Sequence, residues 1–131
     1  RDRVLEITGG RGADVVFDPV GGDIFDAFLR CTAWSGRLLL IGFAAGRVQK
    51  IPANILLVKN LAALGFYWGG YRRQAPQMLA PQFAQIFDWY GQGRIRPRVS
   101  HSADLAHAAK ALALLRNRQA TGKVVLTMTD D

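Results

Sequence analysis

Short apolar runs bounded by turn residues recur along the first half of the chain. Residues 13–18, 37–41 and 61–66 are rich in β-branched, aromatic or leucine side chains and end at glycine, proline or aspartate, which is the pattern of strands. In residues 13–18 both alternating faces are apolar, so we expect a strand that is covered on both sides.

Helical spacing of apolar residues fills the gaps between these runs. We expect the last turns of a helix in residues 1–8 with Gly9 and Gly10 at its C-terminal end, a helix in residues 21–32, and a short helix that begins near Pro52. Strands that alternate with helices are typical of a parallel sheet with right-handed crossovers. The predicted fold class is therefore α/β.

The second half of the chain has a different pattern. Residues 74–93 predict a longer amphipathic helix, residues 95–102 a brief extended segment, and residues 122–129 a final strand. Between the last two, residues 103–119 predict an Ala/Leu-rich helix for which Ser102 is the expected N-cap.

Composition narrows the class of protein. The chain has 131 residues, half of them hydrophobic and about a fifth charged, as in a soluble folded domain. It shows neither a signal peptide nor an apolar run long enough to span a bilayer. A single cysteine, Cys31, excludes a disulfide within the chain and a zinc site of several thiolates, and it fits a cytoplasmic location.

The chain is basic, with a net charge of +7. Residues 71–131 carry nine Lys or Arg against four Asp or Glu, so most of the excess lies in the second half. A nucleic-acid surface is one interpretation, but the charges stand singly or in small groups, so we favour a compositional bias and expect neither a nucleic-acid nor a membrane partner. The candidate residues of such a surface are Arg72, Arg73, Arg94, Arg96 and Arg98.

The three predicted strands all end in small or aromatic residues. If the strands are parallel, these ends lie along one edge, which is where open α/β sheets bind ligands. Asp18 at the first end could hold backbone amides of the next turn or face a ligand. The aromatic residues after the third strand fit a sheet edge that is buried against another domain or subunit better than a platform for bases.

Familiar catalytic and nucleotide-binding motifs are missing from the sequence. Gly10 and Gly12 begin like the G-x-G-x-x-G fingerprint, but Val15 stands at the third glycine and the stretch precedes a strand. His101 and His107 share no helical face and have no acidic partner at metal-ligand spacing. We therefore name no catalytic residue and expect no metal site in this chain.

Four segments taken together resemble the carboxyl-terminal part of medium-chain dehydrogenases/reductases, and most closely the zinc-independent quinone oxidoreductase group. They are EITGGRGADVVFDPVGGDIF, GRLLLIGFAAG, ILLVKNLAALGFYWGGY and ATGKVVL. In that family a GroES-like catalytic domain comes first, followed by the half of the Rossmann domain that carries the glycine fingerprint. The resemblance implies that residues 1–94 are part of a Rossmann-type dinucleotide-binding domain and that residues 95–131 return toward the catalytic domain.

The resemblance also implies positions along a cofactor groove. Val20 and Gly21 would lie near the adenosine and pyrophosphate. Gly42, Phe43 and Ala44 would lie near the nicotinamide ribose. The remaining implied contacts are those of Phe66, Tyr67 and Trp68 with the nicotinamide carboxamide, and that of Lys123 from the catalytic-domain side.

The implied activity is hydride transfer from a reduced nicotinamide, NADPH in preference to NADH, to a quinone or an electron-poor carbonyl compound or alkene. Family dimers extend their sheets through the strand that corresponds to Leu61–Phe66, so a homodimer is expected. Because the phosphate-binding turn is missing, we expect the chain alone to be inactive. A non-catalytic dimerisation or binding module and part of a zinc-dependent alcohol dehydrogenase stay open as alternatives.

Overall fold

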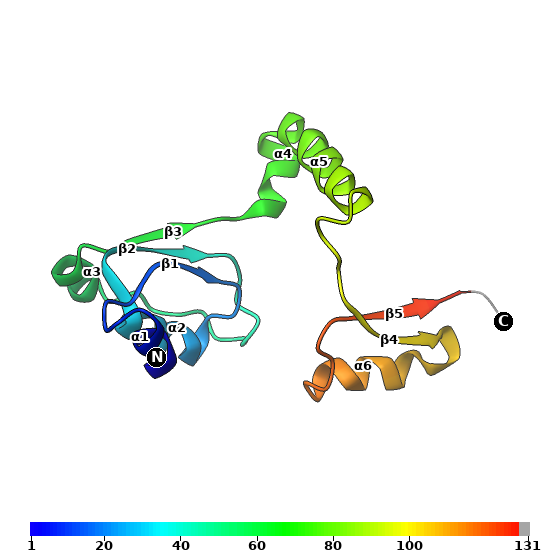
Figure 1. Cartoon of the computed structure of the whole chain (residues 1–131), viewed down its shortest axis with the longest axis horizontal. Helices are drawn as coiled ribbons and strands as arrows, with labels where there is room; N and C mark the ends of the chain where they lie inside the picture. Colours follow the sequence, from blue (N-terminus) through cyan, green and yellow to red (C-terminus); the bar gives the residue numbers. More distant parts are fainter. Residues whose placement is uncertain (129–131) are drawn as a thin grey trace. The chain divides into compact units, whose positions relative to one another are not determined.

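The structure, a computed structural model, describes residues 1–128. The chain divides into two compact units, Arg1–Pro76 and Gln77–Asp131. Each unit has its own small parallel sheet (Figure 1). The two units are defined by their internal contacts and not by function. The predicted functional boundary between residues 94 and 95 therefore stays a prediction.

Unit 1 contains the predicted parallel sheet. Its strands are β1 (Ala13–Asp18), β2 (Thr32–Leu40) and β3 (Ala62–Gly65), in the order β1-β2-β3. Both neighbouring pairs are parallel, with Phe17 opposite Leu39 and Leu39 opposite Leu64. The expectation of parallel strands whose carboxyl ends share one edge is confirmed (Figure 1).

Three helices accompany this sheet: α1 (Asp2–Ile7), α2 (Gly22–Cys31) and α3 (Ala53–Lys59). The core forms where α2 and α3 pack on one face of the sheet, and its buried residues are Val16, Phe25, Leu29, Leu38 and Leu61. Cys31 is buried at the end of α2. Lys59 Nζ donates to the carbonyl oxygens of Leu29 and Thr32 at 2.9 and 2.6 Å, which places a cation at the negative end of the α2 dipole.

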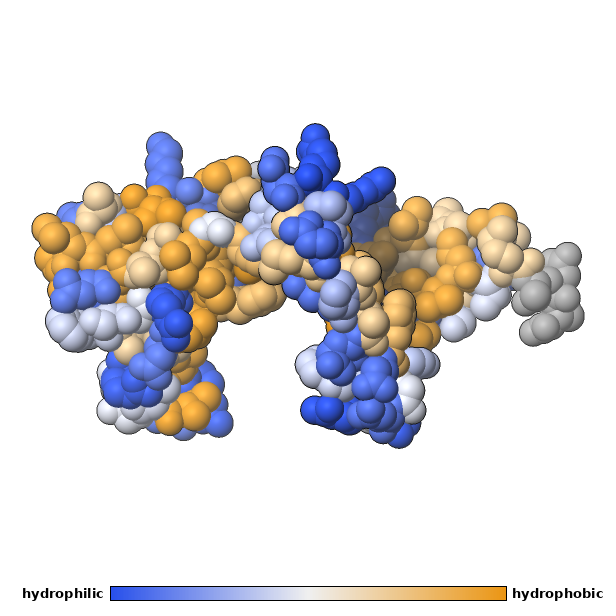
Figure 2. All heavy atoms as spheres, turned by 90° about the horizontal axis from the view of Figure 1, so that it is seen from above, coloured by the Kyte–Doolittle hydropathy of each residue, from blue (hydrophilic) through white to orange (hydrophobic). Residues whose placement is uncertain are grey.

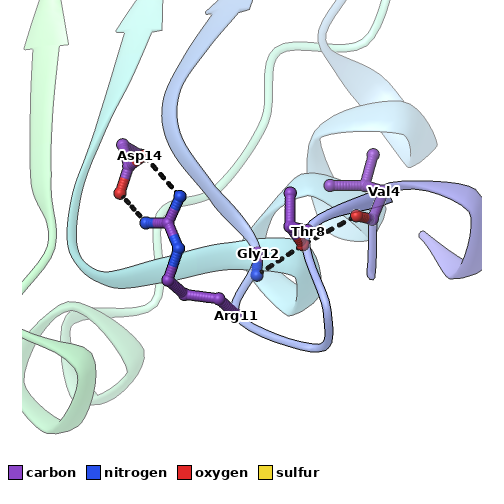
Figure 3. A network of polar contacts seen from close by, with 5 residues as sticks. All are labelled: Val4, Thr8, Arg11, Gly12 and Asp14. Atoms are coloured by element: carbon purple, nitrogen blue, oxygen red, sulfur yellow. Dashed lines mark hydrogen bonds and ion pairs between the residues drawn. The ribbon is translucent and has the colours of Figure 1, made fainter. Parts of the chain in front are cut away.

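A tight turn joins α1 to β1 (Figure 3). Gly10 N–H donates to Leu5 O and Gly9 N–H to Glu6 O, the paired bonds of a Schellman motif. Thr8 Oγ1 donates to Val4 O at 2.8 Å and accepts from Gly12 N–H at 2.9 Å, while the Arg11 guanidinium pairs with both carboxylate oxygens of Asp14. The glycine pair thus ends the helix as predicted.

The opposite face of the sheet is uncovered in the described part of the chain. Val15 and Phe17 on β1 are 46 % and 61 % exposed, and Leu64 on β3 is also exposed. The prediction that β1 is covered on both sides is therefore wrong for this chain, because α2 and α3 pack on the Val16 and Leu38 side. Figure 2 shows hydrophobic residues gathered over much of the visible face of unit 1.

After β3 the chain leaves the sheet through two short helical turns, η1 (Trp68–Gly70) and α4 (Tyr71–Gln74). The Tyr67 ring lies over the two glycines of η1, so a Cβ on Gly70 would come within 2.9 Å of that ring. A further turn, η2 (Pro76–Met78), leads into the predicted amphipathic helix, α5 (Leu79–Gly91). Pro81 is tolerated there because it lies in the first turn of the helix.

Unit 2 ends with a strand–helix–strand element. It consists of β4 (Val99–Asp104), η3 (Leu105–His107), α6 (Ala108–Arg116) and β5 (Lys123–Thr127), and the two strands are parallel. The predicted N-cap Ser102 is wrong, because β4 continues to Asp104, whose Oδ1 accepts from His107 N–H at 2.9 Å. Thr129, the last residue of the predicted strand, lies outside the described residues. Within residues 1–128 we find no helix with the length and apolarity needed to cross a bilayer.

Candidate functional site: the carboxyl edge of the parallel sheet

The first strand end is organised by Asp18. Its side chain is fully buried, and Oδ1 accepts hydrogen bonds from Val20 N–H at 2.9 Å and Gly21 N–H at 2.8 Å. Of the two roles that the sequence left open, the structure shows the first: this carboxylate holds the amides of the next turn. Gly21 has φ +70° and ψ −155°, a combination that is essentially restricted to glycine.

The end of β2 continues into a loop that lies on the turn after β1. We call residues 42–51 the edge loop. Ala44 N–H donates to Pro19 O at 3.2 Å, and Ala45 N–H donates to Val20 O at 2.9 Å. A Cβ on Gly42 would lie 3.1 Å from Pro19 O, so the small residue allows this close approach. The Phe43 side chain is about half exposed beside these glycines.

Charged residues fasten the edge loop to α2. Arg47 Nη2 donates to Asp23 Oδ1 at 2.8 Å and to Asp26 Oδ2 at 2.7 Å. These hydrogen bonds, first to Asp26 and then to Asp23, raise the pKa of Arg47 above its usual value. Both pairs are exposed to solvent, so salt screens them.

The third strand end is aromatic. Phe66 N–H donates to Leu40 O at 3.0 Å, which extends the pairing with β2 by one residue beyond β3. The Phe66 and Tyr71 rings meet with centroids 5.7 Å apart. Phe66, Tyr67 and Trp68 all keep 40 % or more of their surface exposed. The edge therefore presents apolar rings next to small residues and backbone groups.

Eight of the nine predicted site residues belong to unit 1. Val20, Gly21, Gly42, Phe43 and Ala44 come together where the edge loop lies on the β1–α2 turn, and Phe66, Tyr67 and Trp68 follow the adjacent strand. Lys123 opens β5 in unit 2, where its N–H donates to Arg98 O at 2.7 Å. Their contact with a cofactor stays a prediction for all nine.

Two residues that organise this edge were not found from the sequence. Arg47 and Gln49 stand in a loop without periodicity. The residues that they contact, Asp23 and Asp26 for Arg47 and Gly21 for Gln49, lie about twenty residues or more away along the chain. The basic charge after Gly46 was the only signal. A cleft of about 710 Å³ also lies on the helical side of unit 1, lined by Leu29, Arg30 and Ile55 among others, and it contains none of the predicted site residues.

The chemistry of the edge fits part of a nicotinamide cofactor. The edge loop carries small residues at Gly42 and Ala44, and exposed apolar rings can pack against a flat heterocycle. The sequence has no glycine fingerprint after a strand to bind the pyrophosphate, so the predicted positions on that side are those of Val20 and Gly21 alone. Within residues 1–128 no group of three or more His, Cys, Asp or Glu side chains could hold a metal ion.

The fold and the carboxyl edge together define the class of this protein as Rossmann-type α/β. Its parallel sheet corresponds to the half of a Rossmann sheet that follows the phosphate-binding turn. The family model described as zinc-binding dehydrogenase matches residues 1–126. The chain thus belongs to this family of medium-chain dehydrogenases/reductases.

Relatives of the chain are quinone oxidoreductase-like. A quinone oxidoreductase-like protein 2 homolog of Nematostella vectensis is 41 % identical over 127 residues, which are 96 % of this chain and 35 % of the relative. Among solved structures, a mycobacterial protein complexed with NADPH aligns with TM-score 0.82 at 31 % identity. A Pseudomonas syringae pv. Tomato quinone oxidoreductase aligns with TM-score 0.81 at 30 % identity. Each alignment covers 97 % of this chain and 39 % of the solved one, so the chain spans little more than a third of these relatives.

Proposed function

We propose that this chain forms the second half of the cofactor-binding sheet of an NAD(P)H-dependent oxidoreductase that reduces quinones or enones. One observation carries the proposal: three parallel strands end together in glycine, alanine and aromatic residues at one edge. The similarity to a structure complexed with NADPH supports it. NADPH in preference to NADH, and a cytoplasmic location, are parts of the same proposal.

In this proposal a bound reduced nicotinamide supplies the hydride. The residues of this chain bind and orient. Gly42 and Ala44 admit the ribose close to the backbone, Phe43 shields one side of the ring from water, and Phe66, Tyr67 and Trp68 bound the carboxamide end. Val20 and Gly21 border the adenosine and pyrophosphate side. No acid or base in this chain is assigned to the chemistry.

The test compares the 131-residue chain with the longest reading frame that contains it. Titration calorimetry of the short chain with NADPH should give no binding in the micromolar range, because the short chain lacks the glycine fingerprint that binds the pyrophosphate. The longer protein should oxidise NADPH, followed at 340 nm, when a quinone or an enone is present. Micromolar binding by the short chain would refute its expected inactivity, and a longer protein that reduces neither acceptor would refute the function.

A variant pair makes the test specific to the edge. Gly42→Val in the longer protein places a branched side chain whose Cβ lies 3.1 Å from Pro19 O, so it pushes the edge loop away from the β1–α2 turn. We expect this variant to raise the KM for NADPH at least about tenfold, since it displaces the backbone that the cofactor is proposed to approach. Gly91→Val at the end of α5 serves as the control, because Gly91 has neither a positive φ nor a neighbour within 4 Å of its Cβ among the described residues.

A non-catalytic dimerisation module is the second candidate. It is favoured by one observation: β3 is the last strand of the sheet, and Leu64 on it is exposed. In either case we propose that the chain forms a homodimer through residues 61–66. A reading frame that adds no glycine fingerprint, together with a dimeric short chain, would favour this candidate over the enzyme.

A further inference from the structure

Two buried side chains at the carboxyl edge have polar atoms without a hydrogen-bond partner among residues 1–128. Asp18 is fully buried and Gln49 is 6 % exposed. Within the described residues, Asp18 Oδ2 and both amide atoms of Gln49, Oε1 and Nε2, make no hydrogen bond. Since a buried polar atom without a partner has lost its hydrogen bonds to water and gained nothing in return, each of these atoms disfavours the observed conformation.

Both side chains contact one residue, Gly21. Its N–H lies 2.8 Å from Asp18 Oδ1, and a Cβ at this position would lie 2.7 Å from Gln49 Oε1 and 3.5 Å from Phe43 Cδ1. Gln49, which belongs to the edge loop, is therefore packed against the β1–α2 turn, next to the Phe43 ring that the proposed function places at the cofactor. Movement of the edge loop away from the β1–α2 turn would return the Gln49 amide to water.

Few contacts oppose that movement. Residues 43–48 of the edge loop are held by the backbone bonds of Ala44 and Ala45 to the turn, and by the exposed pairs of Arg47 with Asp23 and Asp26. Residues 43–48 are all exposed, so little apolar surface is buried when the loop lies on the turn. Segments with few buried contacts and exposed hydrogen bonds are the first to open.

We propose that Gln49 and Arg47 are positioning residues that act in opposite directions on the edge loop. The unpaired amide of Gln49 favours an open loop, and the Arg47 bridge to α2 favours a closed one. Their balance sets where Phe43 and Ala44 lie. The inference deepens the proposed function, on which its link to a cofactor rests, but loop opening itself can be measured without any cofactor.

Amide hydrogen exchange in the 131-residue chain tests the inference. Ala44 and Ala45 report loop opening, while Leu38 and Leu39 in the central strand report unfolding of the sheet. Gln49→Met keeps a similar length without polar atoms, so exchange at Ala44 and Ala45 should slow by about tenfold. Arg47→Ala should speed it several-fold and remove its dependence on salt, and Arg47→Lys should restore part of the protection.

A matched control is Arg11→Ala, which removes another exposed Arg–Asp pair of unit 1. It should leave exchange at Ala44 and Ala45 unchanged. Unchanged or faster exchange in Gln49→Met would overturn the role of Gln49. The role of Arg47 fails if Arg47→Ala behaves like Arg11→Ala, or if Leu38 and Leu39 change as much as the loop amides, since the effect would then be global. None of these outcomes depends on NADPH, so the proposed function can fail separately.

Discussion

At the scale of single residues, the carboxyl edge depends on backbone conformations that only glycine adopts easily. Gly21 combines a positive φ with an extended ψ, and its missing Cβ leaves the space that Gln49 occupies. Gly46 in the edge loop also has a positive φ, of +79°, but has no neighbour within 4 Å of its Cβ position. The pair separates backbone strain from collision.

We predict that Gly21→Ala destabilises the chain more than Gly46→Ala. The second variant should cost about 1–2 kcal/mol for its left-handed backbone alone. The first adds the collision with Gln49 Oε1, for roughly 1–3 kcal/mol more. Free energies of unfolding from urea titrations measure both. Combining Gly21→Ala with Gln49→Ala should recover part of the difference, and equal losses in the two single variants would show that Gln49 moves aside freely.

The sequence predicted contacts within the β1–α2 turn better than the contacts that hold the edge loop in place. Asp18 followed by Pro19 and two glycines indicated a carboxylate that either holds the next turn or faces a ligand, and its bonds to Val20 and Gly21 show the first role. Arg47 and Gln49 could not be assigned in the same way, because their partners are set by how a loop without periodicity folds back. Local patterns carry no information about such distant pairs.

At the scale of elements, strand and helix positions followed from periodicity except where the backbone is irregular. β1 matches its predicted bounds, whereas β2 begins at Thr32 instead of Arg37. Its early part contains Ser35 at φ +60°, and the pairing with β1 shifts register between Ala13 and Val15. A serine and a glycine at that point are typical of a turn, so the pattern placed the strand start too late.

Helix ends were harder to predict than helix interiors. Ser102 and Asp104 are both good N-cap residues, and the choice between them depended on where β4 stops pairing with β5. The cap that forms makes unit 2 sensitive to pH. A side-chain hydrogen bond with His107, followed by the His107 backbone N–H, lowers the pKa of Asp104 below its ordinary value.

The sign of the resulting pH dependence follows from that shift. A carboxylate with a lowered pKa in the folded state adds stability above its unfolded pKa and loses it as the pH falls through the folded value. We predict that the stability difference between the native chain and Asp104→Asn is full above about pH 5 and declines below about pH 4. Urea unfolding at a series of pH values, followed by circular dichroism, measures it. A difference that stays constant down to pH 3 would contradict the prediction.

At the scale of the whole molecule, the apolar pattern of the strands predicted that the faces of the sheet would be covered. It did not predict which group covers them. Val15, Phe17 and Leu64 read as core residues from their pattern, and they are exposed in this chain. Apolarity records only that removal from water is favourable. It does not say whether the covering group belongs to the same chain, to a second copy or to a bound molecule, which is why parallel topology could be predicted and coverage could not.

The unpaired edge of β3 gives the most direct test of assembly. Phe66 N–H points to β2, where it bonds Leu40 O. Because successive backbone groups of a strand point to opposite sides, the N–H of Ala62 also faces β2, and that of Ala63 faces away from the sheet. A second copy that continues the sheet must use the outward groups, since a strand edge pairs through its free N–H and C=O groups.

Proline at these two neighbouring positions should therefore have different effects. Ala63→Pro removes an outward donor, so we predict that it converts a dimer into a monomer of 14.4 kDa while the unfolding midpoint of the monomer changes little. Ala62→Pro removes a donor to β2 and should lower that midpoint instead. Light scattering after size exclusion gives the mass, and urea unfolding gives the midpoint. If the dimer survives Ala63→Pro, the dimer contact lies on the uncovered face that carries Val15 and Phe17 and not at the strand edge. If the native chain is monomeric at about 100 μM, the edge does not bind a second copy of this chain.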